Sequence, residues 1–158
     1  MKKQLRLSIA VLTALLTLAG VSFAANCTGP GSIIRVKKFR SGGFEYVDFI
    51  VKRPTNSSFH WAVTSPAGPT FTEDPSGNTI TVPGSRFKEI VFRSVTWMCT
   101  IPQTNLATTR IKKVQKIGQF EGVVDYVVGY TGPASKYQGT TATNISATQR
   151  RIRMKFIH

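Results

Sequence analysis

The chain is poor in the residues that most enzyme active sites need. Its 158 residues include two histidines and seven acidic side chains, against 21 lysines and arginines, for a net charge of +14. The two histidines and two cysteines form no HxxxH or CxxC pattern, so the sequence predicts no metal site. It also lacks a Gly-x-Ser-x-Gly elbow, a phosphate-binding loop and a dinucleotide fingerprint. We therefore expect a protein that is not an enzyme and has no catalytic or cofactor-binding residues.

Long hydrophobic runs are missing as well, apart from one near the N-terminus. This run, Leu7 to Val21, is short for a membrane span. It follows a basic start, and Ser22-Phe23-Ala24 after it places small residues at the −3 and −1 positions of a cleavage site. The pattern predicts a secretory signal peptide over residues 1–24 and a secreted or periplasmic location. A retained N-terminal anchor is the alternative.

Removal of this peptide leaves 18 basic and seven acidic side chains, a net charge of +11. The positive charge is therefore a property of the folded part. We expect residues 25–32, which contain Gly29-Pro30-Gly31, to form a flexible lead-in. Residues 33–158 are expected to form a single domain, long enough to bury a hydrophobic core.

Two cysteines remain in the exported chain, Cys27 and Cys99. An even number in such a chain favours a disulfide. The bond would close a long loop, which stabilises a fold by roughly 4 kcal/mol if chain entropy alone is counted. The alternative is two separate thiols, with Cys99 a small buried apolar side chain.

Short strand patterns separated by glycine and proline turns predict an all-β fold, a small antiparallel sandwich with little helix. In 44–52 apolar side chains occupy both faces, with Phe44, Tyr46, Asp48 and Ile50 sharing one of them, so this strand is expected at the centre of its sheet. Segment 111–117 has helix-compatible spacing but no capping box, so a strand is expected. Residues 131–149 are expected to be a loop. The expected strands are 33–39, 44–52, 59–64, 70–72, 79–82, 89–100, 111–117, 123–130 and 150–157.

The densest run of strand-forming residues is 119–130. We interpret Phe120-Glu121-Gly122 as a bend or bulge that precedes a core strand. Without a bulge, Glu121 and Asp125 would share a face because they are an even number of residues apart. Cross-strand ion pairs with nearby lysines are then favoured over a ligand site.

Cations cluster in three of the expected strands and carry the main binding prediction. In the last strand they alternate with Ile152, Met154 and Phe156, which predicts a half-buried strand with a row of cations facing solvent. Neighbouring basic strands would form one basic face; a solvated surface that keeps the protein soluble is the alternative. The candidate residues for an anionic ligand are Arg35, Lys37, Lys38, Lys112, Lys113, Lys116, Arg151, Arg153 and Lys155.

Outside the cytoplasm, anionic partners include peptidoglycan, other wall polymers and lipid head groups. Among the cations, Phe39 is the one aromatic residue expected to be exposed, which argues against nucleic acid as a partner. The prediction is a non-enzymatic module that binds an anionic envelope component. The alternative is an interaction module for another exported protein, through exposed aromatic residues such as Trp61 or Trp97.

Segment 111–130 resembles the signature of the AMIN-like domain family of secreted bacterial proteins. In that family a strand ends in Phe-Glu-Gly, as at Phe120-Glu121-Gly122, and runs into a Val-rich strand that closes on glycine. Gly43-Phe44-Glu45-Tyr46-Val47-Asp48-Phe49 is similar to the family's Gly-Phe-Asp-Arg-Val-Val-Phe strand, with Tyr46 in place of arginine. Segment 150–156 stands where the family has its closing strand, but with cations in place of an acidic step. The resemblance implies a small β-sandwich that docks on the cell envelope, with peptidoglycan a candidate ligand and no catalytic residues.

Overall fold

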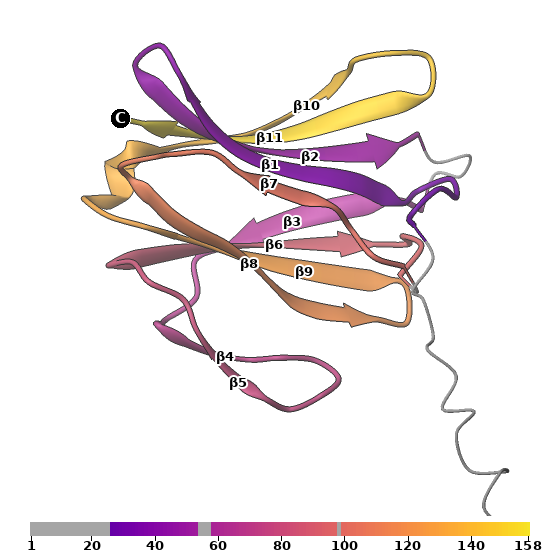
Figure 1. The fold of residues 1–158 in the computed structure, drawn as a ribbon, viewed down its shortest axis with the longest axis horizontal. Helices are drawn as coiled ribbons and strands as arrows, with labels where there is room; N and C mark the ends of the chain where they lie inside the picture. The colour runs from indigo at the N-terminus through magenta and orange to yellow at the C-terminus, as the bar shows by residue number, and fades with distance from the viewer. Residues whose placement is uncertain (1–25, 54–57, 98) are drawn as a thin grey trace, which may run out of the picture.

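Two largely antiparallel sheets packed face to face form a β-sandwich (Figure 1). The computed structural model describes residues 26–53, 58–97 and 99–158, and the predicted signal peptide lies outside these ranges. The predicted all-β sandwich is confirmed, and the helical element within the described ranges is the short 3-10 helix η1 (Ala134–Lys136). No helix in the described part of the chain is long and apolar enough to cross a membrane.

Nine strands make up the two sheets, and two more form a hairpin beside them. The five-stranded sheet has the order β10-β11-β2-β1-β7, with β1 (Ile33–Ser41), β2 (Phe44–Lys52), β7 (Gln103–Asn105), β10 (Tyr137–Asn144) and β11 (Gln149–Ile157). The four-stranded sheet has the order β3-β6-β9-β8, with β3 (His60–Thr64), β6 (Arg86–Arg93), β8 (Ile111–Phe120) and β9 (Val123–Tyr130). The hairpin consists of β4 (Thr70–Thr72) and β5 (Thr79–Thr81).

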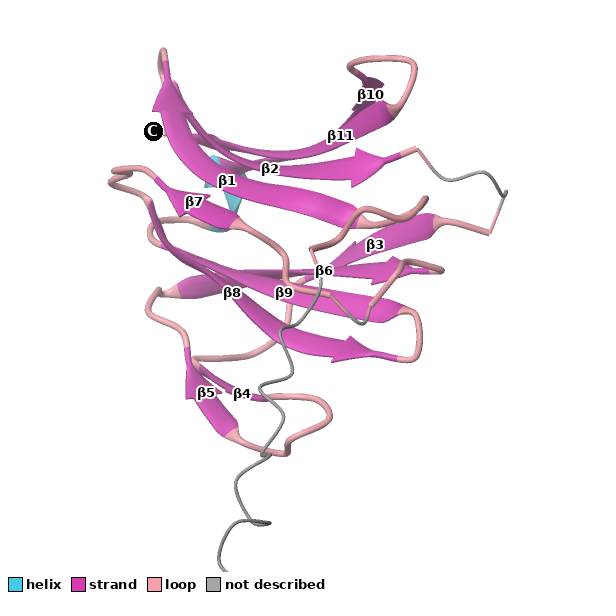
Figure 2. Cartoon of the chain, turned by 45° about the vertical axis from the view of Figure 1, so that its right-hand side comes forward, coloured by secondary structure: helices cyan, strands magenta, loops and turns pink. Residues whose placement is uncertain are grey.

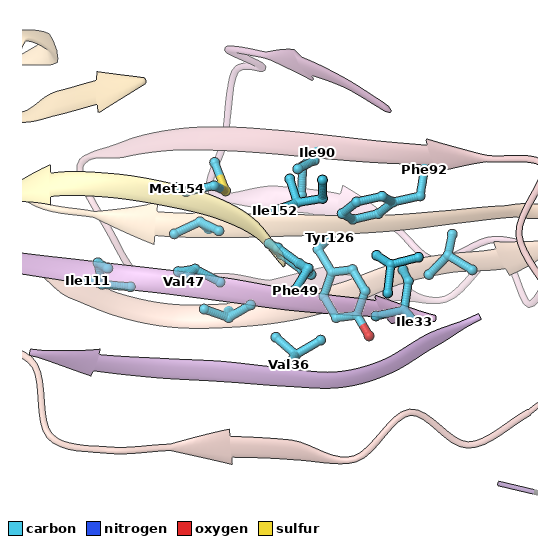
Figure 3. Close-up of a cluster of buried hydrophobic side chains, with 14 of the residues drawn as sticks. Ile33, Val36, Val47, Phe49, Ile90, Phe92, Ile111, Tyr126, Ile152 and Met154 are labelled. Carbon is cyan, nitrogen blue, oxygen red and sulfur yellow. The ribbon is translucent and has the colours of Figure 1, made fainter. Parts of the chain in front are cut away.

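Strand β2 lies at the centre of the five-stranded sheet, as its apolar side chains on both faces predict. Its inner-face residues Val47, Phe49 and Val51 are fully buried. The ring centroid of Phe49 lies 5.0 Å from that of Phe92 and 5.1 Å from that of Tyr126, so the three rings meet between the sheets (Figure 3). Burying a side chain of this size stabilises a fold by roughly 1.5–3 kcal/mol. This contact is therefore a main link between the two sheets.

The hairpin of β4 and β5 covers the outer face of the four-stranded sheet. Its side chains Phe71 and Ile80 pack on a second apolar cluster that contains Phe87, Ile117 and Val127. Because of this cover, β9 is buried on both of its faces. The cover explains the dense run of strand-forming residues in that segment.

Strand β8 is confirmed as a strand, and it forms an edge of its sheet. Some of the backbone N–H and C=O groups on the open side of β8 are hydrogen-bonded to residues outside the sheet. Gln103 Nε2 donates to the carbonyl oxygen of Val114 at 2.8 Å. The N–H of Asp74 donates to the carbonyl of Ile117 at 2.8 Å, and the carbonyl of Asp74 accepts from the N–H of Gln119 at 3.3 Å. These contacts satisfy backbone groups that an edge strand otherwise leaves open.

Cys27 and Cys99 form the predicted disulfide, with a sulfur–sulfur distance of 2.01 Å. The bond joins the start of the described chain to the segment that follows β6. The N–H of Gly31 also donates to the carbonyl of Lys52 at 3.0 Å. The segment predicted to be a flexible lead-in is thus attached to the sandwich by a covalent bond and by backbone hydrogen bonding.

The structure corrects the prediction that 131–149 is a loop, because this segment contains η1 and β10. Strand β10 pairs with β11 along its whole length. Its sequence is rich in threonine, and it lies at the edge of the sheet, where it has polar residues on both faces. The apolar alternation that reveals a half-buried strand is therefore missing. The three-residue strand β7 was missed for the same reason, since all of its residues are exposed.

The predicted bend or bulge at Phe120-Glu121-Gly122 is a hairpin turn. Strand β8 ends at Phe120, and Glu121 and Gly122 connect it to β9. Both turn residues have a positive φ, 44° for Glu121 and 79° for Gly122. A two-residue hairpin turn with both central residues at positive φ is the type I′ turn, whose twist matches that of the flanking strands.

Glu45 is a buried carboxylate on the inner face of β2, with no exposed surface. Its oxygens accept hydrogen bonds of 2.7–2.9 Å from the backbone N–H groups of Thr109, Arg110 and Ile111. His158 Nδ1 lies 2.9 Å from the same carboxylate. Burial acts to raise the pKa of Glu45, but these hydrogen bonds outweigh it and hold the pKa below its ordinary value. The carboxylate thus fixes the chain before β8 against β2.

Replacing this carboxylate should destabilise the fold. In Glu45→Gln the amide presents an NH₂ group to backbone donors, so we expect a loss of about 2 kcal/mol in the free energy of unfolding at neutral pH. Because the folded pKa of Glu45 is depressed, its contribution is present above its ordinary pKa of 4.5 and is lost as the pH falls below it. The loss of stability on acidification should therefore be shallower in the variant. Urea unfolding monitored by tryptophan fluorescence measures both effects.

The matched control is Glu121→Gln, in which an exposed turn carboxylate changes in the same way. Its free energy of unfolding should stay within about 0.5 kcal/mol of the wild-type value. Equal stability of the two variants would contradict the role assigned to Glu45.

Candidate anionic-ligand site

Strand pairing brings the cations of β1 and β11 together on either side of β2. On the outer face of the five-stranded sheet, residues of the three strands lie in cross-strand rows. We call this surface the basic face. Its rows are Arg35 with Ile50 and Arg151, Lys37 with Asp48 and Arg153, and Phe39 with Tyr46 and Lys155.

Asp48 is the acidic member of the basic face, and it is paired. Arg153 Nε donates to Asp48 Oδ1 at 2.6 Å, and Arg153 Nη2 donates to Oδ2 at 2.7 Å. These hydrogen bonds raise the pKa of Arg153, although burial opposes them. The other four cations of the face form no ion pair within the described residues. The basic face therefore has a net charge of +4, and its uncompensated charge lies on both sides of β2.

Aromatic rings lie among these cations, so the expectation that Phe39 would be alone was wrong. The rings of Phe39 and Tyr46 stack with centroids 5.3 Å apart. The guanidinium carbon of Arg153 lies 4.5 Å from the centre of the Tyr46 ring, and Lys155 Nζ lies 3.7 Å from that of Phe44. Such contacts contribute about 0.5–1 kcal/mol each at exposed sites and hold the cations in place. The sequence missed this because Phe44 and Tyr46 come from β2, which has no basic cluster of its own.

The basic face is hollowed. The five-stranded sheet curves upward at the turn between β1 and β2 and at the turn between β10 and β11, so its outer face is concave (Figures 1 and 2). A hollow of about 260 Å³ lies on this face. It is lined by Arg35, Lys37, Phe39, Asp48, Ile50, Ile145, Arg151 and Arg153.

The remaining predicted cations lie away from the basic face. Lys38 alternates with Lys37 and points to the opposite side of β1. Burial lowers the pKa of Lys38, while Glu45 opposes this effect and Lys112 adds to it. Strand β8, in the other sheet, carries the third cluster: Lys112, Lys113 and Lys116. The fold therefore joins two of the three predicted basic clusters and separates the third.

A larger hollow, of about 830 Å³, runs beside the edge strand β8. Its walls carry charges of both signs, from Glu73 and Asp74 and from Lys113 and Lys116. Burial lowers the pKa of Lys116, Glu73 opposes this effect, and the ammonium group donates to Gln119 Oε1. Because its charges balance, this hollow selects an anion less well than the basic face does.

The outer face of the four-stranded sheet carries acidic residues instead. Asp125 of β9 lies there, in a cross-strand position beside Val91 of β6. Burial raises the pKa of Asp125 to about 6; Glu89 and Asp74 add to this effect and Arg93 opposes it. Glu121 and Asp125 would share a face only if the strand ran on unbroken between them, and they do not share one, because Glu121 lies in the β8–β9 turn.

The two tryptophans expected to be exposed are half-buried. Trp61 and Trp97 both pack against the hydrophobic core. The ring of Trp97 also lies edge-on to that of Phe120, with centroids 5.4 Å apart. Their rings are therefore committed mainly to packing, and little of either side chain is free to contact a partner protein.

Ionisation of Asp125 should destabilise the fold. Its folded pKa is raised from 3.8 to about 6, so the stability it contributes is fully present below the unfolded pKa and is lost as the pH rises through about 6. Two pKa units correspond to about 2.7 kcal/mol, which partial exposure reduces to about 1 kcal/mol. Asp125→Asn should therefore be about 1 kcal/mol more stable than wild type near pH 8 and equally stable near pH 4. Chemical unfolding at the two pH values measures this, and a gain that is the same at both would contradict it.

Comparisons with protein-family models, with curated proteins and with solved structures find no match to this chain. The resemblance to the AMIN-like family stays a prediction from the residues of 111–130. The functional argument therefore starts from the geometry and charge of the basic face.

Proposed function

We propose that this protein is an exported, non-enzymatic module that binds an anionic component of the cell envelope through the basic face. The observation that supports this proposal is the arrangement of the cations of the basic face in two columns, one along β1 and one along β11, on either side of β2. Four of these cations have no ion pair among the described residues. Cations gathered on one surface attract polyanions and raise the rate of association. Peptidoglycan, another wall polymer and lipid head groups are the candidate ligands.

Two further features support an exported protein. The sequence pattern of residues 1–24 is that of a secretory signal peptide. The Cys27–Cys99 disulfide is compatible with an oxidising compartment outside the cytoplasm. A secreted or periplasmic location is the one in which an envelope ligand would be available.

A binding role is favoured over catalysis because the one carboxylate of the face, Asp48, is engaged with Arg153 and the other charged groups of the face are cations. Asp48 holds Arg153, and Arg153 and Lys155 lie over aromatic rings. General acid–base catalysis needs a group within hydrogen-bond reach of substrate and a pKa matched to the working pH. Arginine and lysine cations on a sheet face are suited instead to holding carboxylates and phosphates.

The proposal predicts salt-sensitive binding. At low ionic strength the purified protein should co-sediment with isolated peptidoglycan, with a soluble acidic wall polymer immobilised on beads, or with phosphatidylglycerol vesicles. High salt should release it, because surface charges more than a Debye length apart are screened. Failure to bind any of these at low salt would rule out the proposal.

Matched charge variants locate the site. Replacing Arg35, Lys37 and Lys155 together by glutamine should weaken binding about tenfold or more, at up to about 1 kcal/mol for each exposed contact. Replacing Lys112, Lys113 and Lys116 by glutamine removes the same charge from the other sheet and should have a much smaller effect. Equal losses in the two triple variants would show that net charge, and not the basic face, determines binding.

A further inference from the structure

We infer that the ligand of the basic face is a single chain of an acidic polysaccharide, whose sugar units carry carboxylates. This inference rests on the proposed function and names its ligand class. Three features of the face support it: the arrangement of its cations, the apolar part of its floor and its concave shape.

The cations form two columns that suit one polymer chain. Alternate residues of a strand lie about 6.8 Å apart, so Arg151, Arg153 and Lys155 repeat at this interval along β11. Arg35 and Lys37 do the same along β1. Because β2 lies between these strands, the columns are about 10 Å apart. A chain lying over β2 would meet cations at regular intervals from both sides.

The floor between the columns is apolar in part, because the buried Ile50 lies beside the Asp48 carboxylate that pairs with Arg153. Ile50 is buried beneath the hollow, the Phe39 ring lies at its side, and Ile145 reaches it from the β10–β11 turn with 41% of its surface exposed. A polymer of charge alone, such as a polyphosphate, gains nothing from this surface. A sugar ring presents C–H groups on its faces and can carry a carboxylate at its edge. An acidic sugar can therefore pack its C–H groups on the apolar side chains and place its carboxylate against the cations of the two columns.

The curvature of the sheet argues for a chain and against a membrane surface. The turns of β1–β2 and of β10–β11 rise at the two ends of the concave face (Figure 2). A flat bilayer would touch these turns first and leave the cations between them at a distance. A flexible polymer can enter the hollow and reach Lys37 and Arg151 on its walls.

The aromatic rings are poorly placed to stack nucleic acid bases. Stacking needs an open ring face, but Arg153 lies over Tyr46 and Lys155 lies over Phe44. In this arrangement the rings hold the cations in position. The face therefore offers oriented charges to a ligand, and a carboxylate can accept hydrogen bonds from them.

A comparison of probes tests the ligand class. The affinity of the purified protein is measured by isothermal titration calorimetry at low salt for oligogalacturonate, inorganic polyphosphate of matched charge, an oligothymidylate, phosphatidylglycerol vesicles and neutral dextran. We expect oligogalacturonate to bind at least about fivefold more tightly than each of the other charged probes, and dextran not to bind.

Variants of the apolar floor test the same inference separately from charge. Ile145→Ser should weaken oligogalacturonate binding about threefold and leave polyphosphate binding unchanged, because it removes an apolar contact and no charge. The residue is exposed, so the fold should be retained. Ile145→Asn is a second variant with the same expectation, and Phe39 is left unchanged because Lys37 Nζ and the Arg153 guanidinium carbon lie 5.1 Å and 5.4 Å from the centre of its ring. The matched control is Leu106→Ser, since Leu106 is 47% exposed and does not line the hollow.

The outcomes separate this inference from the proposed function. If polyphosphate, oligothymidylate or vesicles bind as tightly as oligogalacturonate, the inferred acidic polysaccharide ligand is wrong and the anion-binding function stands. The same conclusion follows if the floor variants bind oligogalacturonate as tightly as wild type does. If no charged probe binds at low salt, both are wrong. Tighter binding of oligogalacturonate, weakened by Ile145→Ser but not by Leu106→Ser, supports both.

Discussion

Burial of β2 on both of its faces is the constraint on which the rest of the structure depends. On the inner face, Phe49 meets Phe92 and Tyr126 and links the two sheets. On the outer face, Asp48 and Ile50 form the floor between the cation columns of β1 and β11. A strand that is buried on both sides is expected inside its sheet, and β2 is the third of the five strands. The same placement therefore produces the core and brings together basic strands that are far apart in the sequence.

The strands that the sequence predicted well are those with a strong local pattern. The alternation of Ile152, Met154 and Phe156 with cations identifies β11, and apolar residues on both faces place β2 at the centre of its sheet. Strand β10 has no such pattern, because an exposed edge strand needs no apolar face. The composition of the basic face depends on which strands flank β2. That is a long-range pairing, which side-chain periodicity within a single strand does not encode.

Concentrating cations on one face costs free energy through self-repulsion, and several contacts offset that cost here. Asp48 neutralises Arg153 through two hydrogen bonds, and aromatic rings lie under Arg153 and Lys155. The acidic residues near Asp125 lie on the opposite outer face, so they do not cancel the charge of the basic face. The molecule thus has one outer face with an excess of cations and another on which acidic residues lie.

Sheet edges are where β-proteins tend to aggregate, because a strand from another copy can add to the open backbone. The long edge strand β8 is shielded against such growth, since Gln103 caps the carbonyl of Val114 and the Asp74 backbone occupies groups of Ile117 and Gln119. The exposed Lys112 and the half-buried Lys113 on the same strand add mutual repulsion between copies. If copies of the protein were concentrated along the proposed polymer, they would thus be hindered from joining sheet to sheet at β8.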